Sequence, residues 1–287
     1  MAELAEARRM RLLEIIAERD EPQELDSLAA LMNCDARTIR RDLDQIQQIL
    51  KKMQGFEIRR SRVMAVRTGY SPGYFSDQLV KNSLAKEAIA RAIVSKLPDE
   101  VALALTAGST PYYVAKEIRR AVIEGASPKN PIVFTNSVPA LLEMVSAGIS
   151  TGVLGEIYVP EDCALHTPEF HSAVLPSVAI VGASGVSFGL EAGQGGLDLF
   201  SHRAEEAAFM KQLLLNIPEV IIAVDSAKLG KRHPWSFGGK TLYGKKVRLV
   251  TEHLTAEQEE EMKQLTERLA IHGVRFSYEG ASKQCAE

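Results

Sequence analysis

Three short polar segments, each directly after an apolar β-rich run, contain the residue types that hold a small anion. In residues 106–111, Gly108 permits a close backbone approach, Ser109 and Thr110 offer hydroxyls, and a proline suits the first turn of a helix. Backbone N–H groups at a helix N-terminus bind phosphate. The segment therefore fits a phosphate site, and a helix cap without a ligand is an equally good interpretation.

Two further segments repeat this arrangement after later apolar runs. One contains Thr135 and Asn136, and the other contains Asp225 and Lys228, whose ammonium group can neutralise a ligand phosphate. Because the carboxyl ends of parallel strands meet at one edge of an open sheet, we expect the three segments to line one crevice. The candidate ligand-binding residues are Gly108, Ser109, Thr110, Thr135, Asn136, Asp225 and Lys228.

A separate segment near the N-terminus has the chemistry of nucleic-acid binding. Asp35 is placed to cap a helix that begins at residue 36. The apolar stripe of that helix is formed by Ile39, Leu43, Ile46 and Leu50. The side chains off the stripe, near the helix start, are Arg37, Thr38, Arg40 and Arg41. This pattern favours a probe for the major groove, although a charged surface helix has part of the same pattern.

The elements around this segment complete a DNA-binding unit. A helix is expected over residues 5–19, with Met10, Leu13, Ile16 and Ala17 on one face, and a second helix over residues 25–32. With a turn at residues 33–35, the three helices predict a helix-turn-helix. After Gly55, residues 56–59 and 63–66 are expected to pair as a basic wing, in which Arg59 and Arg60 contact phosphate.

The charge is distributed unevenly along the 287 residues. Residues 37–67 contain nine Lys or Arg against three Asp or Glu, whereas residues from 68 onward contain 21 basic and 25 acidic side chains. A basic segment joined to an acidic body is typical of a polyanion-binding unit attached to a small-molecule module. A solvated charged face is the alternative interpretation.

Several classes of protein are disfavoured by the composition. Cys34, Cys163 and Cys285 have no paired spacing, so we expect no disulfide framework, no metal site and no cofactor. The N-terminus lacks the apolar core of a signal peptide, and no apolar run approaches membrane-spanning length. We therefore expect a cytoplasmic protein without a membrane partner.

Beyond a Gly-, Pro- and Ser-containing linker, helical and β-rich patterns alternate. The predicted domains are residues 1–67, a linker at 68–77 and a second domain at 78–287. Helices are expected at residues 83–96, 111–124, 139–147, 203–215 and 256–272. Strands are expected at residues 101–105, 132–134, 178–181, 220–224, 247–250 and 274–278. This alternation predicts an α/β fold with an open sheet.

Both halves of the chain resemble the DeoR-type transcription regulators. Residues 8–50 are similar to the DNA-binding domain of that family, above all in Thr-Ile-Arg-Arg-Asp-Leu at 38–43. Similarity to its sensor domain continues, in order, at Lys86 and at residues 108–110, 135–137, 182–189 and 225–230. The resemblance implies a winged helix-turn-helix followed by a Rossmann-like α/β domain of the ribose-5-phosphate isomerase type. In the family, that domain binds phosphorylated sugars or related metabolites.

The chain departs from the family pattern at three places. The wing lacks the usual His-Gly-Gly-Ala, Thr106 stands where the family has an acid, and Gly155-Glu156 replaces a Gly-Gly pair. The wing contacts with DNA and the class of effector are therefore left open.

An isomerase of the same fold is the alternative to a regulator. Aldose-phosphate isomerisation needs a general base, which the isomerases carry in an Asp-Gly-Ala-Asp-Glu loop. The corresponding residues 181–185 read Val-Gly-Ala-Ser-Gly, and residues 193–196 are not preceded by the isomerase lysine. A phosphate cradle without these groups holds a ligand but does not convert it. A third hypothesis is a DNA-binding protein whose second domain only oligomerises.

The sequence thus predicts a DNA-binding transcription regulator and not an enzyme. We expect a repressor of carbohydrate metabolism genes that binds double-stranded operator DNA and responds to a phosphorylated sugar or related metabolite. Two-fold operators further favour a homo-oligomer, as a dimer or tetramer.

Overall fold

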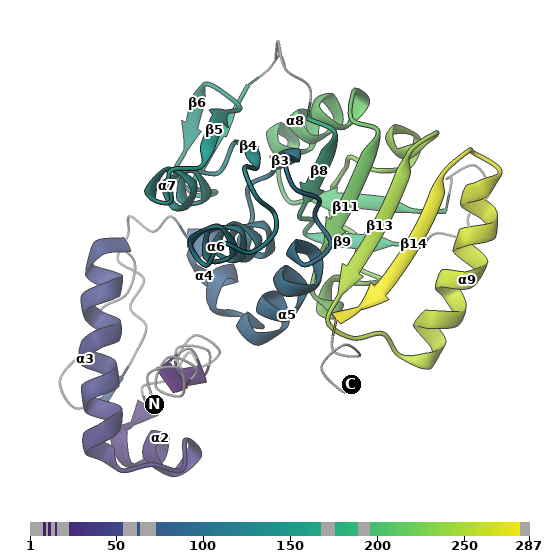
Figure 1. Ribbon diagram of the computed structural model, residues 1–287. Helices are drawn as coiled ribbons and strands as arrows, with labels where there is room; N and C mark the ends of the chain where they lie inside the picture. Colours follow the sequence, from purple (N-terminus) through teal and green to yellow (C-terminus); the bar gives the residue numbers. More distant parts are fainter. Residues whose placement is uncertain are drawn as a thin grey trace. The chain divides into compact units, whose positions relative to one another are not determined.

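The computed structural model describes residues 8, 9, 11, 12, 15, 23–53, 62–63, 73–167, 176–188 and 196–281 (Figure 1). The chain divides into two compact units, one of residues 1–83 with 160–162 and one of residues 84–159 with 163–287. Among the described helices, none combines the length and the apolar character needed to cross a bilayer.

In the first unit, α2 (Leu25–Leu31) and α3 (Ala36–Met53) form a helix-turn-helix. The chain reverses at Asn33, which has a φ of 50°, and the Cys34 N–H donates to the carbonyl of Ala29 at 3.1 Å. Asp35 then caps α3, since its carboxylate accepts the N–H of Thr38 at 2.8 Å and the hydroxyl of Thr38 at 3.0 Å. These bonds lower the pKa of Asp35. The predicted cap is confirmed.

The core of this unit joins the helix-turn-helix to the helical residues before it. Its buried members are Leu12, Ile15, Leu28, Ala29, Ile39 and Leu43. Ile39 and Leu43 therefore occupy the apolar face of α3, as predicted. The side chains of Ile46 and Leu50, and the residues Met10, Leu13, Ile16 and Ala17 expected on the first helix, lie outside the description.

A short ribbon accompanies the helices of the first unit. Strand β1 (Gln23–Glu24) pairs antiparallel with β2 (Arg62–Val63). The expected partner of this second segment, residues 56–59, lies outside the described residues, so the wing hairpin stays a prediction. Helix α4 (Gly73–Val80) includes residues 73–77, which the composition had assigned to the linker. Burial of Phe75 and Val80 gives this helix a tertiary role that glycine and proline content did not indicate.

The second unit is built on a seven-stranded sheet in the order β14-β13-β11-β8-β3-β4-β5, with every neighbouring pair parallel. Its strands are β3 (Ala102–Leu105), β4 (Ile132–Thr135), β5 (Ser150–Val153), β8 (Val178–Val181), β11 (Glu219–Ala223), β13 (Lys246–Thr251) and β14 (Arg275–Gly280). Figure 1 shows these strands side by side with helices packed around them. The predicted α/β fold is confirmed.

The connections between these strands are mostly helical. The α-helices are α5 (Ser83–Val94), α6 (Ser109–Ile123), α7 (Val138–Ser146), α8 (Ala204–Leu215) and α9 (Ala256–Ala270), and the 3-10 turns are η1 (Ser226–Lys228) and η2 (Gly239–Leu242). Two antiparallel pieces complete the unit. One is the pair β6 (Ile157–Val159) and β7 (Ala164–His166), and the other is a small sheet of β9 (Gly185–Ser187), β10 (Asp198–Ser201) and β12 (Trp235–Ser236) in the order β12-β10-β9.

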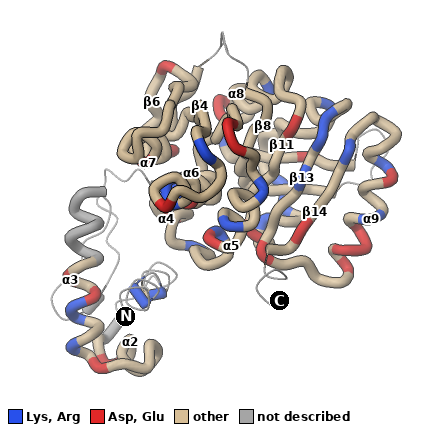
Figure 2. The backbone as a smooth tube through the Cα atoms, in the orientation of Figure 1, with Lys and Arg blue, Asp and Glu red and all other residues tan. Residues whose placement is uncertain are grey.

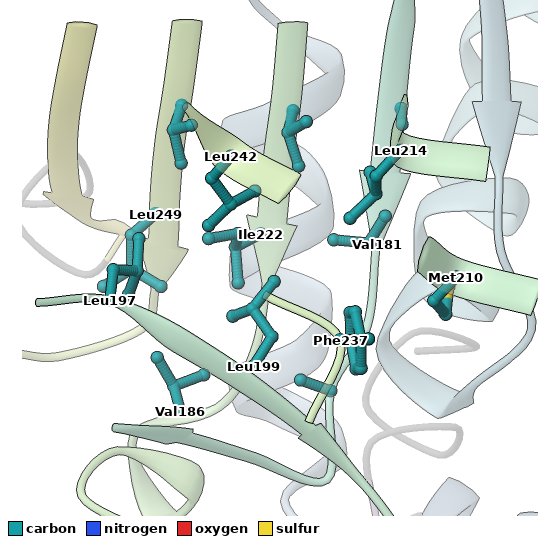
Figure 3. Close-up of a cluster of buried hydrophobic side chains, with 14 of the residues drawn as sticks. Val181, Val186, Leu197, Leu199, Met210, Leu214, Ile222, Phe237, Leu242 and Leu249 are labelled. Atoms are coloured by element: carbon teal, nitrogen blue, oxygen red, sulfur yellow. The ribbon is translucent and has the colours of Figure 1, made fainter. Parts of the chain in front are cut away.

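A large apolar cluster fixes the small sheet against the large one. Alternate residues of the central strands, such as Val181, Ile222 and Leu249, belong to the same buried cluster as Leu199 and Phe237 (Figure 3). Helix α8 contributes Met210 and Leu214. The segments that follow β8, β10 and β11 are thereby held together near the ends of the central strands.

A buried carboxylate ties the start of the chain to α3. Asp42 is only 2 % exposed, and it accepts Arg8 Nε at 2.6 Å, with Arg9 Nε 3.7 Å away. The hydrogen bond to Asp42 raises the pKa of Arg8. Since a buried carboxylate needs compensating partners, this pair is a structural element of the first unit.

We expect Asp42→Asn to destabilise the first unit by about 2 kcal/mol, because the buried charge-assisted hydrogen bond to Arg8 is lost. The measurement is hydrogen exchange of the amides of α2 and α3 in the full chain. Asp44→Asn, at an exposed position of the same helix, is the matched control and leaves the exchange unchanged. Equal protection in the two variants contradicts the structural role of Asp42.

Candidate functional site

Basic positions gather near the start of α3, where Figure 2 marks them along the tube together with acidic ones. Arg37, Arg40 and Arg41 are exposed, whereas Ile39 and Leu43 of the same helix are buried. Thr38 is half-buried, and its hydroxyl donates to the capping carboxylate, so part of its hydrogen-bonding capacity serves the helix start. Three arginines therefore face outward near the N-terminus of a capped helix. Arg59 and Arg60, the predicted wing contacts, lie outside the described residues.

In the second unit, the turn from β3 into α6 combines a glycine in a rare conformation with two buried hydroxyls. Gly108 has a φ of 131°, a conformation that side-chain-bearing residues rarely adopt. No side chain caps the first turn of α6. Ser109 and Thr110 are 4 % and 1 % exposed, and their buried hydroxyls have no hydrogen-bond partner among the described residues. Buried hydroxyls are normally satisfied, so these two indicate a missing acceptor.

The loop after β4 positions this turn. The Oδ1 atom of Asn136 accepts the N–H of Ala107 at 2.7 Å, and its Nδ2 donates to the carbonyl of Leu165 at 3.1 Å. The hydroxyl of Thr135 donates to the carbonyl of Leu105 at 2.6 Å. Both side chains therefore bind backbone on the neighbouring elements. These contacts hold the end of β3 and the turn that follows it in place.

Thr106 joins the same turn to the end of β8. Its hydroxyl accepts the N–H of Gly182 at 3.3 Å, and its own N–H donates to the carbonyl of Ile180 at 3.1 Å. A Cβ at Gly182 would lie 3.1 Å from Cδ of Pro111. Thr106, which stands in place of an acid, therefore forms a neutral, fully buried link between the two loops.

The loop after β11 brings a lysine to the same edge of the sheet. Asp225 is buried, and Nζ of Lys228 lies 3.9 Å from its Oδ2 atom. Burial lowers the pKa of Lys228, whereas the carboxylates of Asp225 and Glu206 act in the opposite direction. The loop is anchored by Glu252, whose carboxylate accepts the N–H of Ser226 at 2.8 Å and its hydroxyl at 2.5 Å.

The predicted residues are thus arranged on three neighbouring parts of one edge. The segments after β3 and β4 are adjacent, and β8 alone separates β3 from β11. At about 4.8 Å per strand, the loops after β3 and β11 start about 10 Å apart. This distance is bridged by the segment that follows β8.

The candidate residues predicted from the sequence do not include four residues that lie near Lys228. Glu206 accepts the hydroxyl of Ser201, and Glu252 holds η1 as described above. His202 and His233 place their ring centroids 3.9 Å apart, with the ring planes at 64°. Single histidines and acidic residues outside a repeated pattern carry no periodic signal, so only the tertiary arrangement brings these four together. Within the described residues, no cluster of His, Cys, Asp and Glu is suited to a metal ion.

The structure thus combines a helix-turn-helix with an α/β domain built on a parallel sheet. A family model described as the DeoR C terminal sensor domain matches residues 81–242. Because the match spans more than half of the 287 residues, the chain belongs to the DeoR family, and the predicted resemblance is confirmed. No curated protein matches significantly.

Solved structures give a more distant likeness. Ribose 5-phosphate isomerase from Plasmodium falciparum is 19% identical with a TM-score of 0.37, over 50% of this chain and 52% of that chain. The isomerase from Methanocaldococcus jannaschii is 19% identical with a TM-score of 0.38, over 52% and 55%. The eIF2B delta subunit from Chaetomium thermophilum is 15% identical with a TM-score of 0.32, over 69% and 58%. The match thus spans about half the length of each isomerase.

We expect Thr110→Val to leave the free energy of unfolding of the ligand-free chain unchanged or to raise it by up to about 1 kcal/mol, because the hydroxyl of Thr110 makes no hydrogen bond among the described residues. Thr135→Val is the matched control at an equally buried threonine. It should cost about 1–3 kcal/mol, since its hydroxyl donates to Leu105. Denaturant unfolding of the full chain compares the two, and equal destabilisation by both contradicts a ligand-ready hydroxyl.

Proposed function

We propose that this chain is a ligand-controlled transcription regulator that represses carbohydrate metabolism genes. In this proposal, Arg37, Arg40 and Arg41 of α3 contact double-stranded operator DNA, and Thr38 lies beside them. The second unit binds a phosphorylated sugar or related metabolite. Membership of the DeoR sensor family supports the regulatory role.

The observation that carries the DNA-binding proposal is the division of α3 into two faces. Ile39, Asp42 and Leu43 are buried within the first unit, whereas the three arginines are exposed beside the capped N-terminus. Arginine side chains at the start of a recognition helix reach guanine edges and phosphates. A helix stabilised by its own core and cap presents them in fixed directions.

The effector proposal rests on the buried hydroxyls of Ser109 and Thr110. They lie at the uncapped start of α6, where the helix dipole and free N–H groups favour an anion. A phosphate oxygen satisfies hydroxyl and backbone donors together. Lys228, one loop further along the edge, adds a positive charge.

The same edge argues against isomerisation as the activity. Residues 182–185 read Gly-Ala-Ser-Gly, so this loop contributes no carboxylate to move a proton. The backbone there is engaged with neighbouring elements, as when the N–H of Ser184 donates to the carbonyl of Phe200 at 2.8 Å. We therefore propose binding without turnover.

DNA binding is tested with duplexes selected by the full chain from a random pool. We expect Arg40→Gln and Arg41→Gln each to weaken binding about 5- to 150-fold, the range for losing one base or phosphate contact of about 1–3 kcal/mol. Arg275→Gln, at an exposed position of β14, is the control and leaves binding unchanged. Failure to select any duplex, or full binding by both α3 variants, contradicts the proposal.

The effector is tested by adding sugar phosphates to the complex of the full chain with its selected duplex. A regulator responds only if its ligand binds the DNA-competent and DNA-free states with different affinities. We expect at least one sugar phosphate to change DNA affinity, and Thr110→Val to remove that change without altering DNA binding in the absence of ligand. A second unit that only oligomerises predicts no response to any of them.

We further propose that the second unit assembles into a homo-oligomer through the edge formed by α7, β5 and β6. Leu142 and Val145 of α7, Val153 of β5 and Ile157 of β6 are each more than half exposed. Strand β5 is the last strand of the large sheet, so its outer side has no neighbouring strand in that sheet. Contiguous exposed apolar side chains favour association.

The assembly proposal predicts that Leu142→Glu with Val145→Glu lowers the subunit number of the full chain in sedimentation velocity. Burying two carboxylates in an apolar contact is unfavourable, so the oligomer should dissociate. The control is Leu215→Glu, at a comparably exposed leucine of α8. An unchanged sedimentation coefficient in the double variant, or a monomeric parent, contradicts this assembly.

A further inference from the structure

We infer that His202 and His233, together with Lys228, form a second anion subsite, and that the effector therefore carries an acidic group at each end. One end is the phosphate proposed above for the α6 N-terminus, and the other is a carboxylate or a second phosphate. This inference rests on the proposed effector site and deepens it by naming the class of ligand.

The two imidazoles form a compact pair contributed by separate segments. His202 follows β10, and His233 precedes β12, with centroids 3.9 Å apart and planes at 64°. The imidazole of His233 makes no hydrogen bond to any described residue. Two crossed rings offer donors in different directions, which suits the several oxygens of a carboxylate or phosphate.

Basic groups gather around this pair. The charge of Lys228 is close enough to act on His202, and that of Lys231 acts on Lys228. The charged and titratable groups on the elements around His202 are His233, Lys228, Lys231, Arg232, Arg203, Asp225 and Glu206. Of these, Arg232 donates to the hydroxyl of Ser187 at 3.1 Å, and Glu206 accepts the hydroxyl of Ser201. The basic side chains of this set outnumber the acidic ones, and their net positive charge favours an anion.

The segment after β8 connects this pair to the proposed phosphate site. At one end, Gly182 donates to Thr106 beside the start of α6. At the other, a Cβ on Gly185 would lie 2.4 Å from the carbonyl of Lys231 and 3.0 Å from Cδ2 of His233. Gly182 and Gly185 belong to one short stretch of backbone. A ligand lying along it therefore has its two ends near the two groups of donors.

The subsite gives ligand binding a definite pH dependence. Burial lowers the pKa of His202, and the charges of His233 and Lys228 lower it further. His202 is therefore less readily protonated near pH 7 than an ordinary histidine. An anionic group bound beside the rings favours the protonated form of His202, so binding takes up a proton. Affinity for a doubly acidic ligand should therefore rise as the pH is lowered from about 8 to about 6.

Two matched pairs of compounds test this inference on the full chain. Glucose 6-phosphate is compared with 6-phosphogluconate, and fructose 6-phosphate with fructose 1,6-bisphosphate, at about pH 6 and about pH 8. Affinity is measured by calorimetry and by the fluorescence of Trp235, the one tryptophan of the chain, two residues from His233. In one of the two pairs, we expect the compound with the second acidic group to bind about tenfold more tightly than its partner at the lower pH. The difference should be smaller at the higher pH. The two pairs distinguish a carboxylate from a phosphate.

Variants identify the groups responsible for that preference. His202→Gln and His233→Gln should each reduce the preference for the doubly acidic member to less than about threefold and remove its pH dependence. Thr110→Val should weaken both members of a pair by the same factor. His272→Gln, a histidine stacked on Tyr243 after α9, is the matched control and retains the preference. Unfolding temperatures show whether each variant remains folded.

Each possible result decides the inference. Monophosphates that bind without any preference in either pair, or a preference retained by both histidine variants, overturn the second subsite and leave the proposed effector site standing. Binding by none of the four compounds overturns the proposed effector site and the second subsite together. A preference lost only in the two histidine variants supports the assignment.

Discussion

The parallel pairing of β4, β3, β8 and β11 determines where the candidate ligand-binding residues lie. Parallel strands direct their carboxyl ends to one edge, and the chain must leave that edge through loops whose backbone groups need partners. Here Asn136 and Thr106 satisfy those groups, by accepting the N–H of Ala107 and the N–H of Gly182. Because the supporting polar side chains bind backbone, the hydroxyls of Ser109 and Thr110 are left for another acceptor. The proposed anion site is thus a consequence of the hydrogen bonds between neighbouring loops.

In the first unit, two acidic residues of one segment have different structural roles. Asp35 is exposed and caps the first turn of α3, while Asp42, two turns later, is buried against Arg8. One fixes where the helix begins, and the other fixes which face is buried. The arginines between them have no such function within the described part of the unit, which is why their exposure supports a role in binding. Acidic residues in a cationic helix therefore do not oppose a DNA contact.

The proposed regulator places two energetic requirements on one chain. The helix-turn-helix needs fixed side-chain directions, and its cap and apolar core provide them. The ligand-binding unit needs polar groups that are incompletely satisfied without ligand, which costs stability that binding restores. In the loops after β3, β8 and β11, close backbone approaches at Gly182 and Gly185 and the buried hydrogen bond from Gly182 to Thr106 hold these polar groups in position. Such linked loops provide a route by which an anion at one end affects groups at the other.

The sequence by itself determined the long periodic elements and the end of each central strand. Apolar strands such as Val178–Val181 and amphipathic helices such as Ala256–Ala270 were predicted because their patterns depend on neighbours close in the sequence. The short strands β5, β6, β7, β9, β10 and β12 were not, because patterns of two to four residues are too brief to indicate a strand. Only the tertiary structure decided that Thr135 and Asn136 contact backbone, and that His202 meets His233. Residue type indicates which atoms can bind an anion, whereas long-range packing decides which of those atoms are already in use.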